Sequence, residues 1–171
     1  MNKFPAFKNP GFTLVELLVS VSILAVLTAV TIPNFNNFIR SQNLKQSQEQ
    51  IKNGIRDTQI RAMAGVDSTN YSYWVFRASS GGTTFNIGKS ADTTSCGSIT
   101  VVDTSAVLPG DATLGVSSSP ACIYYAMGSG IVTQTGLYSN IYVRTSISGS
   151  STCYSVEING SGLIKGVNSC P

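Results

Sequence analysis

Residues 12–32 form an apolar run, FTLVELLVSVSILAVLTAVTI, in which Glu16 is the single charged residue. A helix of about 20 apolar residues is long enough to cross the hydrocarbon core of a bilayer. The segment ahead of the run is short and contains Lys3 and Lys8, and basic residues favour the cytoplasmic side of a membrane. The run therefore predicts one membrane-spanning helix, with its N-terminus inside and the chain beyond Pro33 outside.

We expect the apolar run to stay in the mature protein. A secretory signal peptide ends at a cleavage site with small residues in an A-x-A-like arrangement. The residues that follow the run, PNFNNFIRSQ, contain no such site. Glu16 then remains inside an apolar helix, where an ionisable side chain is costly and is a functional candidate. The alternative is a simple signal-anchor in which Glu16, one turn into the run, extends to the membrane interface.

The chain has few charged residues and no histidine. Charged residues make up 11% of the chain, against about 25% in average proteins, so hydroxyl and amide groups must keep the surface soluble, as in secreted proteins. Without Lys3 and Lys8, nine basic residues face eight acidic ones, which argues against a broad nucleic-acid-binding surface. The absence of histidine excludes Ser-His-Asp and Cys-His catalysis and histidine-ligated metals. We expect no enzymatic activity and no cofactor.

The four cysteines, Cys96, Cys122, Cys153 and Cys170, all lie in the C-terminal half and form no C-x-x-C pair. An even number of widely and irregularly spaced cysteines is typical of disulfides in an oxidising compartment. Free buried thiols are the alternative. Four cysteines allow three connectivities, and their spacing does not choose among them.

Beyond Pro33 the sequence predicts that the helix continues as an amphipathic one. Proline lacks an N–H group, so we expect a kink or a local loss of helix at Pro33. Apolar residues then recur at helical spacing, with lysine, glutamine and arginine between them, at Leu44, Ile51, Ile55 and Ala62. Gly65 is a suitable end for this helix, and Gly54 is a weak point within it because glycine costs about 1 kcal/mol relative to alanine.

After Gly65, short segments rich in aromatic and β-branched residues alternate with Gly, Ser, Asn and Pro, which is typical of antiparallel strands. The predicted strands are residues 71–76, 98–102, 121–127, 140–147 and 154–158, and Asn159-Gly160 predicts a closing hairpin with Leu163-Ile164. The fold class is therefore α+β, with a sheet over the helix. Trp74 and Phe76 are expected in the core, with a ligand-stacking site as the alternative.

Residues 78–84 and 104–120 are predicted to be loops. The glycine-rich residues 78–84 lack the lysine and the spacing of a phosphate-binding loop. Three acids, Asp92, Asp103 and Asp111, have the ligand chemistry for calcium, but their spacing matches no calcium loop. We therefore predict no metal site and interpret these acids as solvated.

Residues 11–16, GFTLVE, followed by the apolar run and Pro33, resemble the class III signal of type IV pilins and type II secretion pseudopilins. The resemblance implies that a prepilin peptidase cleaves between Gly11 and Phe12 on the cytoplasmic side and methylates the new N-terminus at Phe12. It also implies that Glu16 neutralises the amino group of a neighbouring subunit during filament assembly, and that the helix can extend at Pro33. Two charges in a low-dielectric core are tolerated when they are paired.

The resemblance implies a type IV pilin-like organisation in four parts. These are a leader peptide (1–11), a hydrophobic transmembrane and assembly helix (12–33), an amphipathic helix (34–65) and an antiparallel β-rich head (66–171). The implied location is the bacterial inner membrane before assembly, as a single-pass protein with its N-terminus inside, and a periplasmic or extracellular pilus or pseudopilus afterwards. The implied partners are other pilin subunits, the prepilin peptidase and the inner-membrane assembly platform.

Two further segments, IKNGIRDTQIRAMAG from residue 51 and the C-terminal SVEINGSGLIKGV, resemble the FimT and GspH group of minor pilins. This resemblance implies a structural minor subunit of a pilus or pseudopilus. The alternatives are a type II secretion pseudopilin and a minor pilin that binds extracellular DNA. For DNA binding this chain offers Arg144 and Lys165, and two cations predict weak, salt-sensitive binding.

The resemblance also bears on the disulfides. Many pilins have a C-terminal disulfide loop, which implies a bond between Cys153 and Cys170 that holds the end of the chain. Cys96 is then left with Cys122.

Overall fold

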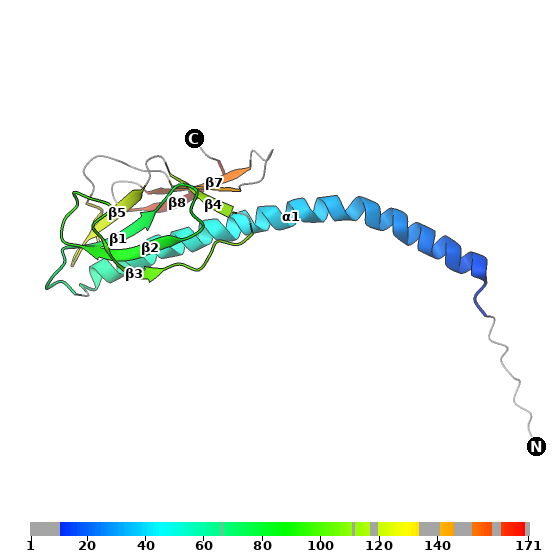
Figure 1. The fold of residues 1–171 in the computed structure, drawn as a ribbon, viewed down its shortest axis with the longest axis horizontal. Coiled ribbons are helices and arrows are strands. Elements are labelled where there is room, and N and C mark those ends of the chain that lie inside the picture. Colours follow the sequence, from blue (N-terminus) through cyan, green and yellow to red (C-terminus); the bar gives the residue numbers. More distant parts are fainter. Residues whose placement is uncertain are drawn as a thin grey trace, which may run out of the picture. The chain divides into compact units, whose positions relative to one another are not determined.

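The computed structural model describes residues 11–65, 67–110, 112–116, 120–133, 141–145, 152–158 and 162–169, with backbone alone at 30–34 and 141–145. One helix precedes eight strands along these residues (Figure 1). Their bounds are α1 Leu14–Met63, β1 Tyr73–Ala78, β2 Phe85–Ser90, β3 Thr100–Thr104, β4 Ala112–Val116, β5 Ala121–Ala126, β6 Ile141–Thr145, β7 Cys153–Ile158 and β8 Ile164–Val167. The chain divides into two compact units, Met1–Ile39 and Arg40–Pro171, which are described separately.

In the second unit, α1 is amphipathic, as the sequence predicts. Its predicted apolar stripe is buried, with exposed fractions of at most 2% at Leu44, Ile51, Ile55 and Ala62. The helix ends at Met63, and the Gly65 N–H donates a hydrogen bond to the Ala62 carbonyl at 3.1 Å. Gly65 has a φ of 64°, a left-handed conformation that favours glycine at helix C-termini. The predicted helix stop at Gly65 is therefore confirmed.

The predicted β-rich head contains two antiparallel sheets rather than one. Their strand orders are β3-β2-β1-β5 and β4-β6-β7-β8, and every neighbouring pair is antiparallel. One hydrophobic core joins α1 to strands of both sheets, and the cyan part of α1 lies beside them in Figure 1. The α+β fold class, with a long helix packed on antiparallel sheet, is confirmed.

Two strands lie where the sequence predicted none. β2 fell in a stretch without a prediction, and β4 lies inside residues 104–120, which were wrongly predicted to be a loop. β4 pairs with β6, which follows much later in the chain, and Leu114 at its centre is 1% exposed. Because β4 is short and contains glycine, its formation as a strand depends on pairing with β6. The prediction of a loop at residues 78–84 is confirmed, since the hairpin of β1 and β2 closes there.

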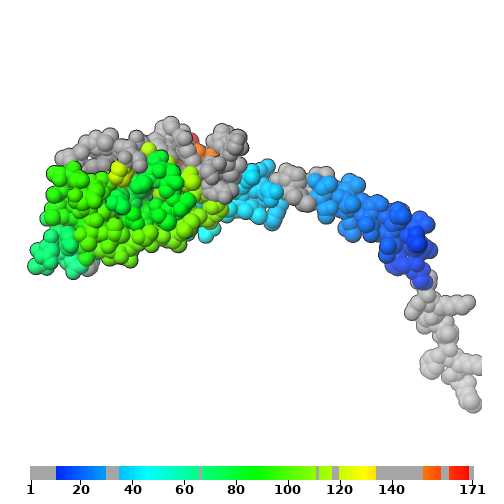
Figure 2. Space-filling view, viewed as in Figure 1, coloured from blue at the N-terminus to red at the C-terminus, as the bar shows by residue number. Residues whose placement is uncertain are grey.

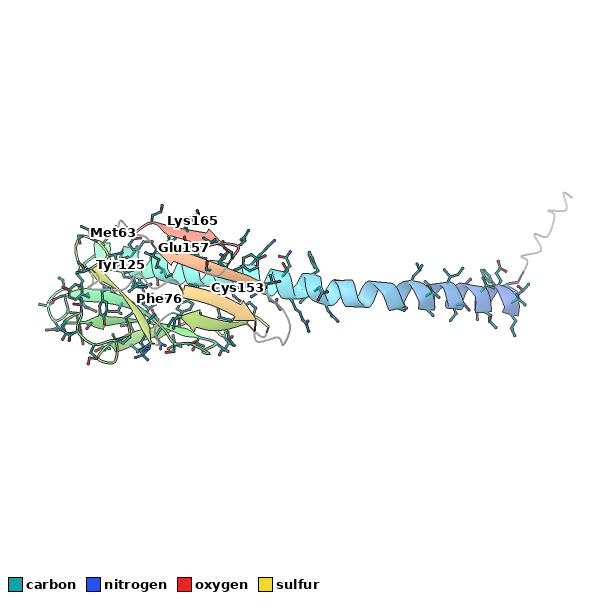
Figure 3. The ribbon with its side chains drawn as sticks, turned by 90° about the horizontal axis from the view of Figure 1, so that it is seen from above. Met63, Phe76, Tyr125, Cys153, Glu157 and Lys165 are labelled. Carbon is teal, nitrogen blue, oxygen red and sulfur yellow. A yellow bond between two sulfur atoms is a disulfide. The ribbon has the colours of Figure 1, made fainter. Side chains whose placement is uncertain are left out.

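Trp74 and Phe76 are core residues, as predicted. Trp74 is 2% exposed and Phe76 is fully buried, with its ring 4.8 Å from the ring of Phe85 (Figure 3). The cations of Arg61 and Lys89 lie 5.3 Å and 5.1 Å from the Trp74 ring centre. Because the chain's own cations contact this ring, the ligand-stacking alternative has no support in the geometry.

The two cations at Trp74 are held by acids. Arg61 pairs with Asp57 at 3.0 Å and with Asp103 at 2.5 Å, and Lys89 pairs with Asp67. Burial acts to lower the pKa of Arg61, but its hydrogen bonds to the two aspartates outweigh burial and raise that pKa. Asp103 is thus an ion-pair partner rather than a simply solvated acid, and it connects β3 to the end of α1.

Gln48 connects α1 to the second sheet. It is 7% exposed, and its Nε2 donates hydrogen bonds to the carbonyls of Ser155 at 2.7 Å and Val167 at 3.2 Å. Ser155 and Val167 are register partners on β7 and β8. A buried polar group is tolerated when it is hydrogen-bonded, so Gln48 fixes where the last two strands meet the helix.

A disulfide joins Cys96 to Cys122, as predicted. Cys122 lies on β5, and Cys96 lies in the segment between β2 and β3. The bond holds Cys96 and Ile99 against a second small cluster of Val75, Cys122 and Tyr124. The segment therefore covers the face of the first sheet that points away from α1. Cys153 is also disulfide-bonded, and Cys170, its predicted partner, lies outside the described residues.

We expect the free energy of unfolding of the Cys96→Ser/Cys122→Ser variant to be about 3 kcal/mol lower than that of the native protein, because a cross-link over a loop of this size restricts the unfolded chain. The measurement is urea unfolding of the processed chain in detergent, followed by fluorescence of Trp74, which is the single tryptophan. As a control, the variant is unfolded with and without dithiothreitol. The difference between these two measurements gives the contribution of the Cys153 disulfide, which the variant keeps. Equal stability of variant and native protein would contradict the assigned role of the bond.

Candidate assembly and processing segment

The first turn of α1 is capped by Thr13. The Glu16 N–H donates a hydrogen bond to Thr13 Oγ1 at 3.2 Å, and the Leu17 N–H donates to the Thr13 carbonyl at 3.2 Å. These bonds make Thr13 the N-cap and put Glu16 at the third helical position. The pattern Thr-x-x-Glu ahead of an apolar run is the sequence signature of a capping box. The role of Thr13 as N-cap was not predicted, although the sequence contains this signal.

Glu16 is exposed and lies at the positive end of the helix dipole. A carboxylate in the first turn gains about 0.3–1 kcal/mol from that dipole. Burying an unpaired ion costs several kcal/mol, even after local relaxation. The helix terminus alone therefore does not offset the cost of placing Glu16 in an apolar environment, and a full positive charge is needed beside it.

The large apolar side chains that are described in the first unit are exposed. Their exposed fractions lie between 40% and 79%, and Figure 2 shows residues 11–29 in blue as an open surface on the side in view. The large members are Phe12, Leu14, Val15, Leu17, Leu18, Val19, Val21, Ile23, Leu24, Val26, Leu27, Phe35, Phe38 and Ile39. A contiguous apolar surface of this kind marks a membrane or protein interaction site.

The hydroxyl groups within this segment are satisfied inside the helix. Ser20 donates to the Glu16 carbonyl at 2.7 Å, Ser22 to the Leu18 carbonyl at 2.8 Å, and Thr28 to the Leu24 carbonyl at 2.9 Å. Such bonds to the preceding turn let hydroxyl residues lie on a helix without water. The carboxylate of Glu16 is then the strongest polar group that the described residues 12–29 offer to a partner.

Gly11 precedes the helix, lies outside regular secondary structure and is exposed. A Cβ atom built at Gly11 meets no heavy atom within 4 Å, and its φ is not among the positive ones. The described fold therefore gives no steric or conformational reason for glycine at this position. The rest of the predicted leader, residues 1–10, lies outside the described residues.

The backbone at Pro33 is helical, because α1 runs without a break from Leu14 to Met63. Of the two alternatives predicted at Pro33, the local loss of helix does not occur, since one missing N–H removes one hydrogen bond of a long ladder, and the kink stays a prediction. The Pro33 side chain is not described. Over the described residues, no helix combines the length and the apolar character that crossing a membrane requires.

The two candidate DNA contacts are separated in the second sheet. Arg144 is paired in register with Cys153, and Lys165 is paired with Glu157, four residues further along β7 (Figure 3). Lys165 is exposed, and the side chain of Arg144 is not described. An acidic residue beside Lys165 weakens its attraction for phosphate. DNA binding through these two residues stays a prediction.

The acids considered for calcium do not gather. The Asp92 carboxylate accepts hydrogen bonds from the Thr94 hydroxyl at 2.7 Å and the Thr94 N–H at 2.9 Å, and these two bonds lower the pKa of Asp92. Asp103 pairs with Arg61, and Asp111 lies outside the described residues. Among the described residues, no group of three potential metal ligands is found.

Comparisons with known proteins bear on the N-terminal segment. No curated protein and no solved structure matched the chain. Residues 7–32 match the family model described as the prokaryotic N-terminal methylation motif. This motif is typical of type IV pilins and pseudopilins, which are structural proteins, and it implies processing by a prepilin peptidase, anchoring in the inner membrane and assembly with other pilins. The Gly11-Phe12 junction, Thr13 and Glu16 all lie within the matched residues, so the chain carries a pilin-type N-terminal methylation signal on an α+β fold.

Proposed function

We propose that this protein is a structural, minor subunit of a type IV pilus or pseudopilus. The observation that carries the proposal is the methylation motif at residues 7–32, which coincides with a helix segment whose described large apolar side chains are exposed. The α+β head supplies the soluble part of such a subunit. The resemblance of residues 51–65 and 155–167 to the FimT and GspH group supports the minor role.

Processing falls between Gly11 and Phe12 in this proposal, and Phe12 receives the methyl group. Gly11 is exposed, and a side chain there would meet nothing in the described fold. Its glycine is thus explained by an external requirement, namely that an extended backbone without a side chain fits a protease cleft. Cleavage leaves the helix cap at Thr13 intact, because Phe12 remains ahead of it.

Glu16 then pairs with the new amino group of a neighbouring subunit. Its carboxylate lies in the first helical turn, four residues after the Phe12 amine that cleavage creates. In a bundle of staggered helices, the amine of one subunit and the carboxylate of the next can be brought to one level. Once the two groups pair, neither charge is left unpaired in the apolar core, which is why an acid is tolerated at this position.

The location follows from the same arrangement. The protein is a single-pass inner-membrane protein with its N-terminus inside before assembly, and it passes to a periplasmic or extracellular filament afterwards. The disulfide between Cys96 and Cys122 supports exposure of the head to an oxidising compartment. The inner-membrane assembly platform and the prepilin peptidase are the partners in these steps.

The test is intact-mass spectrometry of the membrane-extracted protein, expressed with and without an active prepilin peptidase. We expect loss of residues 1–11 and gain of one methyl group with the peptidase, and an unchanged chain without it. Gly11→Val should block processing because a branched side chain obstructs the cleavage site, whereas Ala6→Val, within the leader, should not. An unprocessed native chain beside an active peptidase would refute the proposal.

A further inference from the structure

In the second unit, one face of α1 is covered by the sheets and the opposite face is open. The open helix face consists of the exposed residues Lys45, Glu49, Asn53, Arg56, Ile60 and Met63. Successive members are separated by three or four residues, so they align along one side of the helix. The buried residues, among them Leu44, Ile51 and Ile55, lie on the other side. Met63, at the end of this face, lies against Gly130, and the other members are exposed.

The charges of the second unit are segregated toward this helix. Residues 40–63 contain five basic and two acidic residues, whereas residues 64–171 contain four basic and five acidic ones. Both helix acids are already used, because Glu49 pairs with Lys52 at 2.7 Å and Asp57 pairs with Arg61 at 3.0 Å. Among the described residues, Lys45 and Arg56 take part in no salt bridge. The open helix face therefore carries an uncompensated positive charge.

We propose that the open helix face docks a different filament subunit, one that carries acidic residues on its facing helix. This inference rests on the proposed function, since it requires helices to pack side by side in a filament. A second copy of this chain packed through the same face would bring the like charges of Lys45 and Arg56 together, and these repel across an interface. The helix of a second copy also offers no free acid between residues 40 and 63, because Glu49 and Asp57 are already paired. An acidic helix instead satisfies both cations, and charge patterns of this kind decide which partner is accepted.

The apolar end of the face narrows the chemistry of the partner. Ile60 is 58% exposed and Met63 is 50% exposed, one turn beyond Arg56. A fitting partner therefore combines acids with apolar residues one turn further along its helix. Because the charges are exposed, the contact should weaken as salt rises from low to physiological concentration and above.

The experiment is site-specific photocrosslinking in cells that assemble the native filament. A photoreactive residue replaces Asn53, which lies within the open helix face, and a second variant carries it at Ala25 in the apolar helix. Adducts are mapped by mass spectrometry. We expect the Asn53 adduct to join this chain to a helical, acidic segment of a different pilin-type subunit. Lys45→Glu/Arg56→Glu should reduce this adduct about tenfold, and Lys45→Arg/Arg56→Lys should leave it unchanged.

Each outcome decides the question. A homotypic adduct at Asn53, or a heterotypic adduct at a basic or uncharged segment, overturns the inference. An adduct at Ala25 without one at Asn53 also overturns it, while the proposed function stands. Absence of the processed protein from filaments, with no adduct at either position, refutes the proposed function itself. Retention of the Cys96–Cys122 disulfide in the charge-reversed variant shows that a lost adduct is not caused by unfolding.

Discussion

Glu16→Ala should reduce incorporation of the processed subunit into filaments by about 100-fold or more. Removing one member of a desolvated ion pair leaves the other charge uncompensated, at a cost of about 3–5 kcal/mol. A loss of 1.4 kcal/mol corresponds to about tenfold in an equilibrium, so the lower end of that cost already gives the stated effect. The measurement compares the subunit in sheared filaments with the processed subunit in membranes, by quantitative immunoblotting.

The controls separate the charge of Glu16 from its place in the helix cap. Thr13→Ala removes the N-cap hydroxyl, which accepts the Glu16 N–H, but keeps the carboxylate. It should cost about 1 kcal/mol of helix stability and reduce incorporation only modestly. Glu16→Gln keeps the shape and should behave like Glu16→Ala, because it removes the charge. Normal incorporation of Glu16→Gln would show that filament assembly does not require an ion pair between residue 16 and the amine.

The helix and the N-terminal segment could be predicted because their signals are local. The buried stripe from Leu44 to Ala62 follows directly from helical spacing, and Gly65 ends the helix through its left-handed conformation. The capping role of Thr13 was equally readable from the sequence, as Thr-x-x-Glu before an apolar run. Of the kink and the local loss of helix expected at Pro33, the loss does not occur, because one missing N–H has a small effect in a long helix.

The sheets could be predicted only in part because their order depends on distant partners. β2 contains Gly88, and a Cβ there would come 2.5 Å from the Thr100 carbonyl oxygen on β3. Glycine lowers strand propensity, yet here it permits the two strands to approach at an irregular register. β4 likewise depends on β6, and two hydrogen bonds of 2.7 Å join Leu114 to Gly81 and Gly82 in the preceding hairpin. No local pattern reports these contacts.

Gly54 was interpreted from the sequence as a weak point, and the structure changes that interpretation. A Cβ atom at Gly54 would overlap the ring of Phe85 and would come 3.3 Å from Phe76 Cε2. Phe85 is 5% exposed and packs on Phe76, so its ring has little room to move. Glycine thus lets the first sheet approach the helix closely, and this packing offsets the loss of helix propensity at Gly54.

We expect Gly54→Val to destabilise the head by about 3 kcal/mol, because overpacking a filled core costs about 1–3 kcal/mol and a β-branched residue gains little in a helix. Gly54→Ala should be destabilising too, by about 1 kcal/mol, since the gain in helix propensity does not outweigh the overlap with Phe85. Both are measured by urea unfolding of the processed chain in detergent, with Trp74 fluorescence as the signal.

Asn53→Val provides the matched control, because it puts the same side chain one residue away, on the exposed side of the helix. It should change the free energy of unfolding by less than about 0.5 kcal/mol. Phe85→Leu makes room at the contact and should recover part of the loss in Gly54→Val, so the two changes should not be additive. If Gly54→Val matches Asn53→Val in stability, the close approach of Phe85 to the helix is not what requires glycine at this position.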